Sequence, residues 1–151
     1  MEESKRLVWH EIAPAGAKAL AGVHHYVTTG TDLPEELIHL VFLRVSQING
    51  CAYCIDLHTR DLLKTMAVDK VALVPVWAEV LQLFPERYRA ALAWAEEVTR
   101  VSETHASDEA YAAASQAFAP KELVDLTIAI AAMNAFNRLG APFRLPVKAR
   151  P

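Results

Sequence analysis

The amino-acid sequence predicts an all-α fold. Apolar residues recur every three or four positions, and residues that cap or end helices separate these segments. No segment alternates apolar and polar residues as a half-buried strand would. The 151 residues have the size of one domain with its own core, so we expect a single domain over residues 1–151.

The first well-marked helix follows Asp32, which can cap it. Pro34 suits its first turn, and Glu35 lies three positions after the cap. Apolar residues continue at helical spacing to Ile48, and Gly50 then interrupts the pattern. We therefore expect one helix to end and another to begin directly around Gly50.

Further helices are expected along the rest of the chain. Their expected positions are about 51–65 with an outward Asp56–Arg60 pair, 69–83 broken by Pro75, 85–101, a helix that begins at Asp108 after a Ser107 cap, and 123–139. Residues 102–106 are expected to form a polar connection. The last helix is apolar all round, which predicts burial in the domain centre or between subunits, and Gly140 ends it. The total is roughly six to eight helices.

Composition and charge exclude several classes of protein. The net charge of −3 and the scattered basic residues argue against a nucleic-acid-binding protein. No apolar run approaches the length of a membrane span, and the N-terminus carries no apolar signal core, so a cytoplasmic location is expected. Hydrophobic residues make up 53% of the chain, which favours a homo-oligomer that covers part of this surface.

The two cysteines of the chain, Cys51 and Cys54, lie three residues apart, and His58 follows four residues later. If a helix begins near Cys51, all three side chains share one face of it. The first turn of a helix favours a thiolate over a thiol. In a reducing compartment this CxxC motif indicates redox chemistry, catalysis or metal binding rather than a structural disulfide.

Two stretches of the chain resemble a known family. Residues 43–61 read LRVSQINGCAYCIDLHTRD, and residues 125–130 read DLTIAI, followed by Asn134 and by Asn137-Arg138-Leu139. Both stretches are similar to the AhpD-like alkylhydroperoxidases of the carboxymuconolactone decarboxylase superfamily. The resemblance covers about residues 33–144. It implies an all-helical AhpD-like domain with the CxxC motif at the N-terminus of a central helix.

The resemblance also implies an activity. Proteins of this group reduce small organic hydroperoxides through a redox-active CxxC motif, without metal or haem, and assemble into trimers or hexamers. By this resemblance Cys54 attacks the peroxide, Cys51 resolves the product into a disulfide, and His58 activates the thiol. No cofactor is expected, but an external thiol or disulfide reductant must regenerate the dithiol.

One position departs from the family pattern. The family's proton relay uses a glutamate twelve residues before the first cysteine, and His39 occupies that position here. Glu35 or Glu36, one turn earlier, could supply the missing carboxylate. Tyr53 also replaces a histidine that some members use. The candidate catalytic residues are therefore Cys54, Cys51, His58 and, in the altered relay position, His39.

Three alternative functions compete with peroxide reduction. Cys51, Cys54, His58 and His39 together form a Cys2His2 ligand set that could bind zinc. A non-catalytic oligomeric member of the family is a second alternative. Lactone decarboxylation is a third and weaker one, because that reaction does not need the CxxC motif. Three other histidines, His24, His25 and His105, are expected on the surface.

Overall fold

The computed structural model describes residues 6–150, and this part of the chain forms nine α-helices, two 3₁₀ helices and no strand. The all-α prediction is thereby confirmed. The α-helices are α1 (Trp9–Ile12), α2 (Pro14–Thr29), α3 (Glu35–Asn49), α4 (Ala52–Leu62), α5 (Val68–Leu73), α6 (Glu86–Thr99), α7 (Val101–Thr104), α8 (Asp108–Ala117) and α9 (Pro120–Gly140), and the 3₁₀ helices are η1 (Val74–Glu79) and η2 (Leu81–Leu83).

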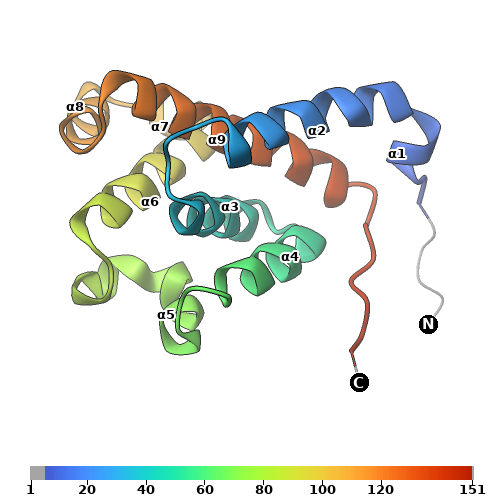
Figure 1. Ribbon diagram of the computed structural model, residues 1–151, viewed down its shortest axis with the longest axis horizontal. Helices are drawn as coiled ribbons and strands as arrows, with labels where there is room; N and C mark the ends of the chain where they lie inside the picture. The colour runs from blue at the N-terminus through green and yellow to red at the C-terminus, as the bar shows by residue number, and fades with distance from the viewer. Residues whose placement is uncertain (1–5, 151) are drawn as a thin grey trace.

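Helices α3 and α9 form the centre of the molecule. Helix α3 packs against α4, α6 and α9, while α9 also contacts α2, α6 and α8. Figure 1 shows α2 and α9 side by side along one edge, with α3 beneath them and α4 and α5 on the far side. The core residues at this centre include Phe42, Leu37, Leu126, Ile130 and Met133, each at most 1% exposed.

The chain reverses between α3 and α4 at Gly50. This residue has a φ of +68°, in the left-handed region that side chains other than glycine's rarely adopt. The backbone N–H of Cys51 donates to the carbonyl of Ser46 and closes the end of α3. Cys51 is then the N-cap of α4, and its sulfur accepts a hydrogen bond from the N–H of Cys54. The predicted helix break and the N-terminal CxxC position are both confirmed.

Hydrogen bonds between side chains connect the turn at Gly50 to α9. The Nδ2 of Asn49 donates to Oδ1 of Asn134 at 2.9 Å and to Oδ1 of Asn137 at 3.0 Å. The Nδ2 of Asn137 in turn donates to the hydroxyl of Ser46 at 3.1 Å. Buried polar groups with full partners fix one packing arrangement. Asn134 and Asn137, which belong to the second stretch of the family resemblance, thus hold α9 close to the turn that precedes α4.

Several local expectations were wrong. Helix α2 was not anticipated, because it is rich in alanine and glycine and buries only Val27, so few large apolar side chains mark its buried side. Residues 102–106, expected as a connection, mostly belong to the single turn α7. The segment 69–83 divides into α5 and two 3₁₀ helices around Pro75. These short elements raise the α-helix count of the described residues above the expected six to eight.

Other local expectations are confirmed. Ser107 caps α8 by accepting from the N–H of Ala110, and Asp56 pairs with Arg60 on α4. The last helix, α9, lies at the centre of the molecule, one of the two positions that its apolar sequence predicted, and it ends at Gly140. No helix among residues 6–150 combines the length and the apolar character that crossing a membrane requires.

Candidate active site

The two cysteines form a disulfide at the N-terminus of α4. Their Cα atoms are 5.3 Å apart, and Cys51 is fully buried while Cys54 is 5% exposed. The structure therefore represents the oxidised state of the CxxC motif. In this state neither sulfur is a thiolate, the form in which cysteine binds a metal, so the Cys2His2 ligand set does not exist in it.

The last turn of α9 lies directly on the disulfide. A Cβ atom at Gly140 would lie 2.7 Å from Sγ of Cys51 and 3.4 Å from Sγ of Cys54. The absence of a side chain at this position is what lets α9 approach the two sulfurs so closely. Sequence reasoning assigned Gly140 only to the end of the helix and missed this contact, which lies 89 residues from Cys51 along the chain.

A cavity of about 530 Å³ opens beside the disulfide. Its wall is largely apolar, and residues from both ends of the chain contribute to it. Cys54 and His58 line this cavity, whereas Cys51 is not among its lining residues. The other lining residues are Trp9, His10, Ala17, Ala21, His24, Tyr53, Leu57, Met133, Phe136, Leu145, Pro146 and Lys148. The redox centre thus presents one of its two sulfurs to a space large enough for a small organic molecule.

His58 is a buried, neutral imidazole next to this cavity. Its side chain is 4% exposed, and its ring packs at 5.0 Å from that of Phe42. Burial is the main cause that lowers the pKa of His58 to about 4; His39 adds to the lowering and Asp61 opposes it. At neutral pH the ring can therefore accept a proton.

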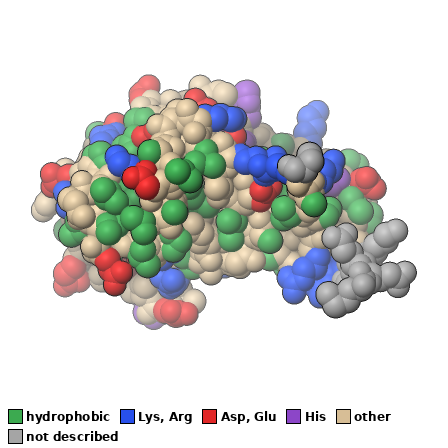
Figure 2. All heavy atoms as spheres, turned by 90° about the horizontal axis from the view of Figure 1, so that it is seen from below, with side chains coloured by type: hydrophobic (Ala, Val, Ile, Leu, Met, Phe, Trp, Pro, Cys, Tyr) green, Lys and Arg blue, Asp and Glu red, His purple; other side chains and the backbone are tan. Residues whose placement is uncertain are grey.

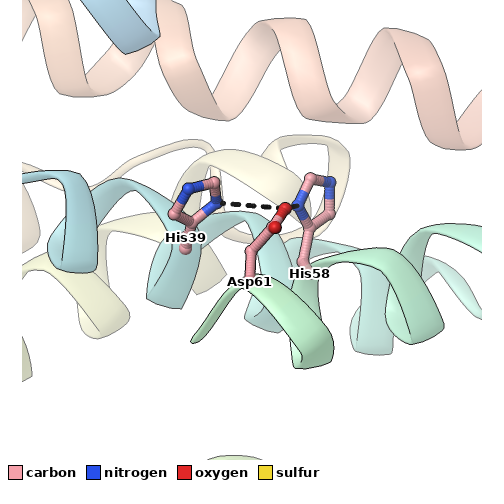
Figure 3. A group of neighbouring side chains, drawn as sticks. All are labelled: His39, His58 and Asp61. Atoms are coloured by element: carbon pink, nitrogen blue, oxygen red, sulfur yellow. Dashed lines mark ion pairs between the residues drawn. The ribbon is translucent and has the colours of Figure 1, made fainter. Parts of the chain in front are cut away.

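One carboxylate, that of Asp61, faces both histidine rings. Its Oδ2 lies 3.9 Å from Nδ1 of His58 and 3.8 Å from Nδ1 of His39, and Figure 3 shows the carboxylate between the two rings. Glu35 approaches the opposite nitrogen of His39 at 3.5 Å from an exposed position. Glu36 points elsewhere and accepts from the hydroxyl of Tyr88.

The structure brings His39 and His58 together and places two carboxylates beside them. Glu35, one of the two expected candidates, lies next to His39, and Asp61, which was not expected, lies between the rings. The position of Asp61, three residues after His58 on the same helix face, was a usable signal. Partial burial would raise the pKa of the Asp61 carboxyl, but the Lys64 hydrogen bond and His39 lower it by more. Asp61 is therefore ionised at neutral pH.

His24 is a correction to the sequence analysis. It was expected on the surface, but it is half-buried, stacks on Phe42 at 5.5 Å, lies 6.0 Å from the ring of Phe136 and lines the cavity. Burial lowers the pKa of His24, and His39 lowers it further. His25 and His105 are exposed, as expected. Helix α2, which carries His24, buries only Val27, so its sequence did not mark the side that lies against the core.

Comparisons with known proteins identify the family. Residues 14–97 match the carboxymuconolactone decarboxylase family. The uncharacterized protein YdfG of Bacillus subtilis is 33% identical over 137 residues, which cover 90% of this chain and 92% of that protein. The chain therefore belongs to the carboxymuconolactone decarboxylase family, as the two sequence stretches predicted.

Solved structures share the fold. A protein of unknown function from Agrobacterium tumefaciens, proposed to be the antioxidant defence protein AhpD, has a TM-score of 0.92 and 33% identity, and the match covers 97% of this chain and 100% of that one. The debrominase Bmp8 has a TM-score of 0.78 and 21% identity over 92% of this chain and 74% of its own. The predicted AhpD-like fold is thus confirmed.

The contact of Gly140 with the disulfide predicts that Gly140→Ala destabilises the oxidised protein. The added methyl group cannot fit at 2.7 Å from a disulfide sulfur, so the free energy of unfolding should fall by about 1–3 kcal/mol. Urea denaturation of the oxidised proteins measures this change. Gly22→Ala, in open space within α2, is the matched control and should stabilise by up to about 1 kcal/mol. Equal effects of the two substitutions would contradict the packing argument.

Burial of His58 predicts that acid destabilises the protein. The unfolded ring binds a proton at the ordinary pKa of a histidine, 6.5, and the folded ring only at a pKa of about 4. Between these values the unfolded state holds more protons, so stability falls by about 3 kcal/mol as the pH falls through this range. Urea denaturation from about pH 7 to about pH 4 in metal-free buffer should show a smaller loss for His58→Gln. Identical losses in both proteins would exclude His58 as the source.

Proposed function

We propose that this protein reduces small organic hydroperoxides through the Cys51–Cys54 pair, as an alkylhydroperoxidase-like thiol peroxidase. The observation that carries the proposal is the asymmetry of the disulfide. Cys54 and His58 line a largely apolar cavity, whereas Cys51 lies fully buried behind Cys54. A peroxide in that cavity reaches one sulfur only, and the other is placed to resolve the product.

The reaction begins with the reduced pair. The thiolate of Cys54 attacks the distal oxygen of the hydroperoxide, so that an S–O bond forms and the O–O bond breaks. The alkoxide that leaves takes up a proton and becomes an alcohol. The sulfur of Cys51 then attacks the sulfenic acid of Cys54, forming the disulfide and releasing water. The dithiol thereby supplies the two electrons that reduce the peroxide.

His58 acts as the base that takes the thiol proton of Cys54. Its Nδ1 faces Asp61, which favours the tautomer with hydrogen on Nδ1 and a free electron pair on Nε2. The carboxylate also stabilises the imidazolium that forms when the proton is transferred. Asp61 is thus a positioning residue that supplies the carboxylate missing at position 39, and His39 links the site to solvent.

The protein needs no cofactor for this chemistry, but a reductant must return two electrons to the disulfide after each cycle. We propose an external thiol or disulfide reductant for this step. The apolar cavity wall favours an alkyl hydroperoxide over a large polar substrate. The proposed AhpD assignment of the Agrobacterium structure, 33% identical to this chain, supports the same class of reaction.

We also propose a homo-oligomer in the cytoplasm. Figure 2 shows apolar side chains spread between charged ones over the face seen from below in Figure 1. On α4, α5 and the 3₁₀ helices, the apolar residues Leu63, Val68, Val76 and Leu81 are each more than 40% exposed. Association of copies of the chain would remove such surface from water.

The proposed function predicts distinct products for the two cysteine variants. An alkyl hydroperoxide added in small excess to the reduced, metal-free protein should remove two hydrogens and both free thiols. Cys51→Ser should stop at a sulfenic acid on Cys54, and Cys54→Ser should not react. Intact-mass spectrometry and thiol titration measure these products. A Cys54→Ser variant that reacts like the wild type, or a wild type with unchanged thiols, would refute the proposal.

The relay predicts that Asp61→Asn slows peroxide reduction by about tenfold to hundredfold near neutral pH, because an amide cannot stabilise the imidazolium of His58. The rate should recover at higher pH, where the thiol of Cys54 ionises without help from a base. Stopped-flow measurement of the pH–rate profile tests this shift. A uniform loss at every pH would instead indicate a purely structural role. Asp56→Asn, on the same helix, is the matched control.

A further inference from the structure

Three potential ligand atoms face one another beside the redox centre. They are Nδ1 of His39 on α3, and Nδ1 of His58 and Oδ2 of Asp61 on α4. The ligand atoms of the three residues lie within 4.8 Å of one another. Figure 3 shows that both rings turn a nitrogen toward the carboxylate between them.

The two nitrogens are buried and lack hydrogen-bond partners among the described residues. Their distances to Oδ2 of Asp61, 3.8 and 3.9 Å, exceed the length of a hydrogen bond. Buried polar atoms are normally paired. Two such nitrogens aimed at one oxygen therefore mark a position for a shared ligand.

The two oxygens of the Asp61 carboxylate have different neighbours. Oδ1 of Asp61 accepts a hydrogen bond from Nζ of Lys64 at 2.8 Å, which leaves Oδ2 to face the rings. The ring of Phe42 packs against both imidazoles, at 5.0 Å from His58 and 6.2 Å from His39. The three donors are thus oriented in advance, and their charges sum to −1 when both rings are neutral.

The spacing suits a small metal ion after the cluster contracts. A tetrahedral ion with bonds of about 2.1 Å holds its ligands about 3.4 Å apart. The two separations from Oδ2 of Asp61 need to shrink by about half an ångström, and that between the two nitrogens, which lie within 4.8 Å of each other, by at most about 1.4 Å. Asp61 and His39 are 22% and 14% exposed, so an ion can enter from solvent.

We propose that His39, His58 and Asp61 bind one divalent transition-metal ion, with Zn²⁺ as the preferred ion, and that the bound ion inhibits the redox centre. Two imidazoles and one carboxylate, with a fourth position left for water, form a donor set that suits Zn²⁺. Ca²⁺ and Mg²⁺ prefer oxygen ligands and are disfavoured here. This site differs from the Cys2His2 set considered from the sequence, because it uses no sulfur and is compatible with the disulfide.

Inhibition follows from the tautomer of His58. The base that deprotonates Cys54 needs hydrogen on Nδ1 and a free electron pair on Nε2. A metal ion on Nδ1 reverses this arrangement, because the remaining hydrogen of the neutral ring must then reside on Nε2. The ring can no longer accept the thiol proton. This consequence rests on the proposed function, whereas metal binding itself does not.

The test is a titration of Co²⁺ into the oxidised, tag-free protein, with the intact disulfide verified by mass. Co²⁺ occupies such sites and reports a low coordination number by its visible ligand-field absorption. We expect one ion per chain and displacement of Co²⁺ by Zn²⁺. Zn²⁺ should also raise the midpoint of thermal unfolding, because the ion binds only the folded site.

Substitutions in the cluster should weaken the binding of Co²⁺. His39→Ala, His58→Ala and Asp61→Asn each remove one donor, and each should lower the affinity by about tenfold or more. His25→Ala and Asp56→Asn alter a histidine and an aspartate outside the cluster and should bind like the wild type. Circular dichroism verifies that each variant is folded. Because Asp61→Asn preserves size, it also tests the site if an alanine variant fails to fold.

Two results would overturn the metal site. One is the absence of stoichiometric Co²⁺ and Zn²⁺ binding to the oxidised wild type. The other is binding that only the reduced protein shows and that Cys54→Ser removes, which would place the ion on the thiols. The inhibition is tested separately, as loss of the peroxide reaction of the reduced wild type in Zn²⁺ and its recovery in chelator. If the protein binds Co²⁺ as expected but never reduces peroxides, the proposed function fails and the metal site stands.

Discussion

The site depends on the contact between the last turn of α9 and the first turn of α4. Gly140 lies against both sulfurs, and any side chain there would push α9 away from the disulfide. Asn137 and Asn49, hydrogen-bonded to each other, hold the two segments at this distance, and Gly50 supplies the left-handed turn that places Cys51 at the start of α4. The buried face of the redox centre is therefore made by a helix that carries no cysteine.

This contact explains why the two sulfurs differ. The end of α9 covers Cys51 completely, while Cys54, one turn further along α4, opens to the cavity. The cavity wall is assembled from both ends of the chain, and the guanidinium of Arg6 donates to the carbonyl of Pro142 at 2.6 Å, so that these ends lie next to each other. The proposed order, in which Cys54 attacks and Cys51 resolves, rests on this one-sided access.

The proton transfer and the metal binding that we propose both depend on His39 and His58. His58 is neutral because it is buried, yet an ionised carboxylate, Asp61, lies at the same end of its ring. A proton on Nδ1 makes the ring a base toward Cys54, and a metal ion on Nδ1 removes that property. The same three groups can thus serve catalysis or bind a cation, but not both at once.

Local features of the sequence were sufficient to predict much of the fold. The apolar spacing of α3, the break at Gly50 and the apolar run of α9 are encoded by neighbouring residues, and the structure places these elements as expected. The expected Asp32 cap is wrong, because Pro34 is the N-cap of α3 and no side chain caps this helix. The spacing of Cys51 and Cys54 was enough to predict that both lie in the first turn of a helix. Two helices escaped prediction, α7 because it is a single turn and α2 because it buries only Val27.

Only the tertiary structure decided which distant residues complete the site. The sequence by itself determined the all-α class, the CxxC helix and the alignment of His58 with Cys54, since these follow from helical periodicity. It could not show that Gly140 lies on the disulfide, that His24 lines the cavity, or that Asp61 rather than Glu35 lies between the two histidines. These contacts form where α2, α3, α4 and α9 pack together. The sequence pattern of one helix does not indicate how another helix packs against it.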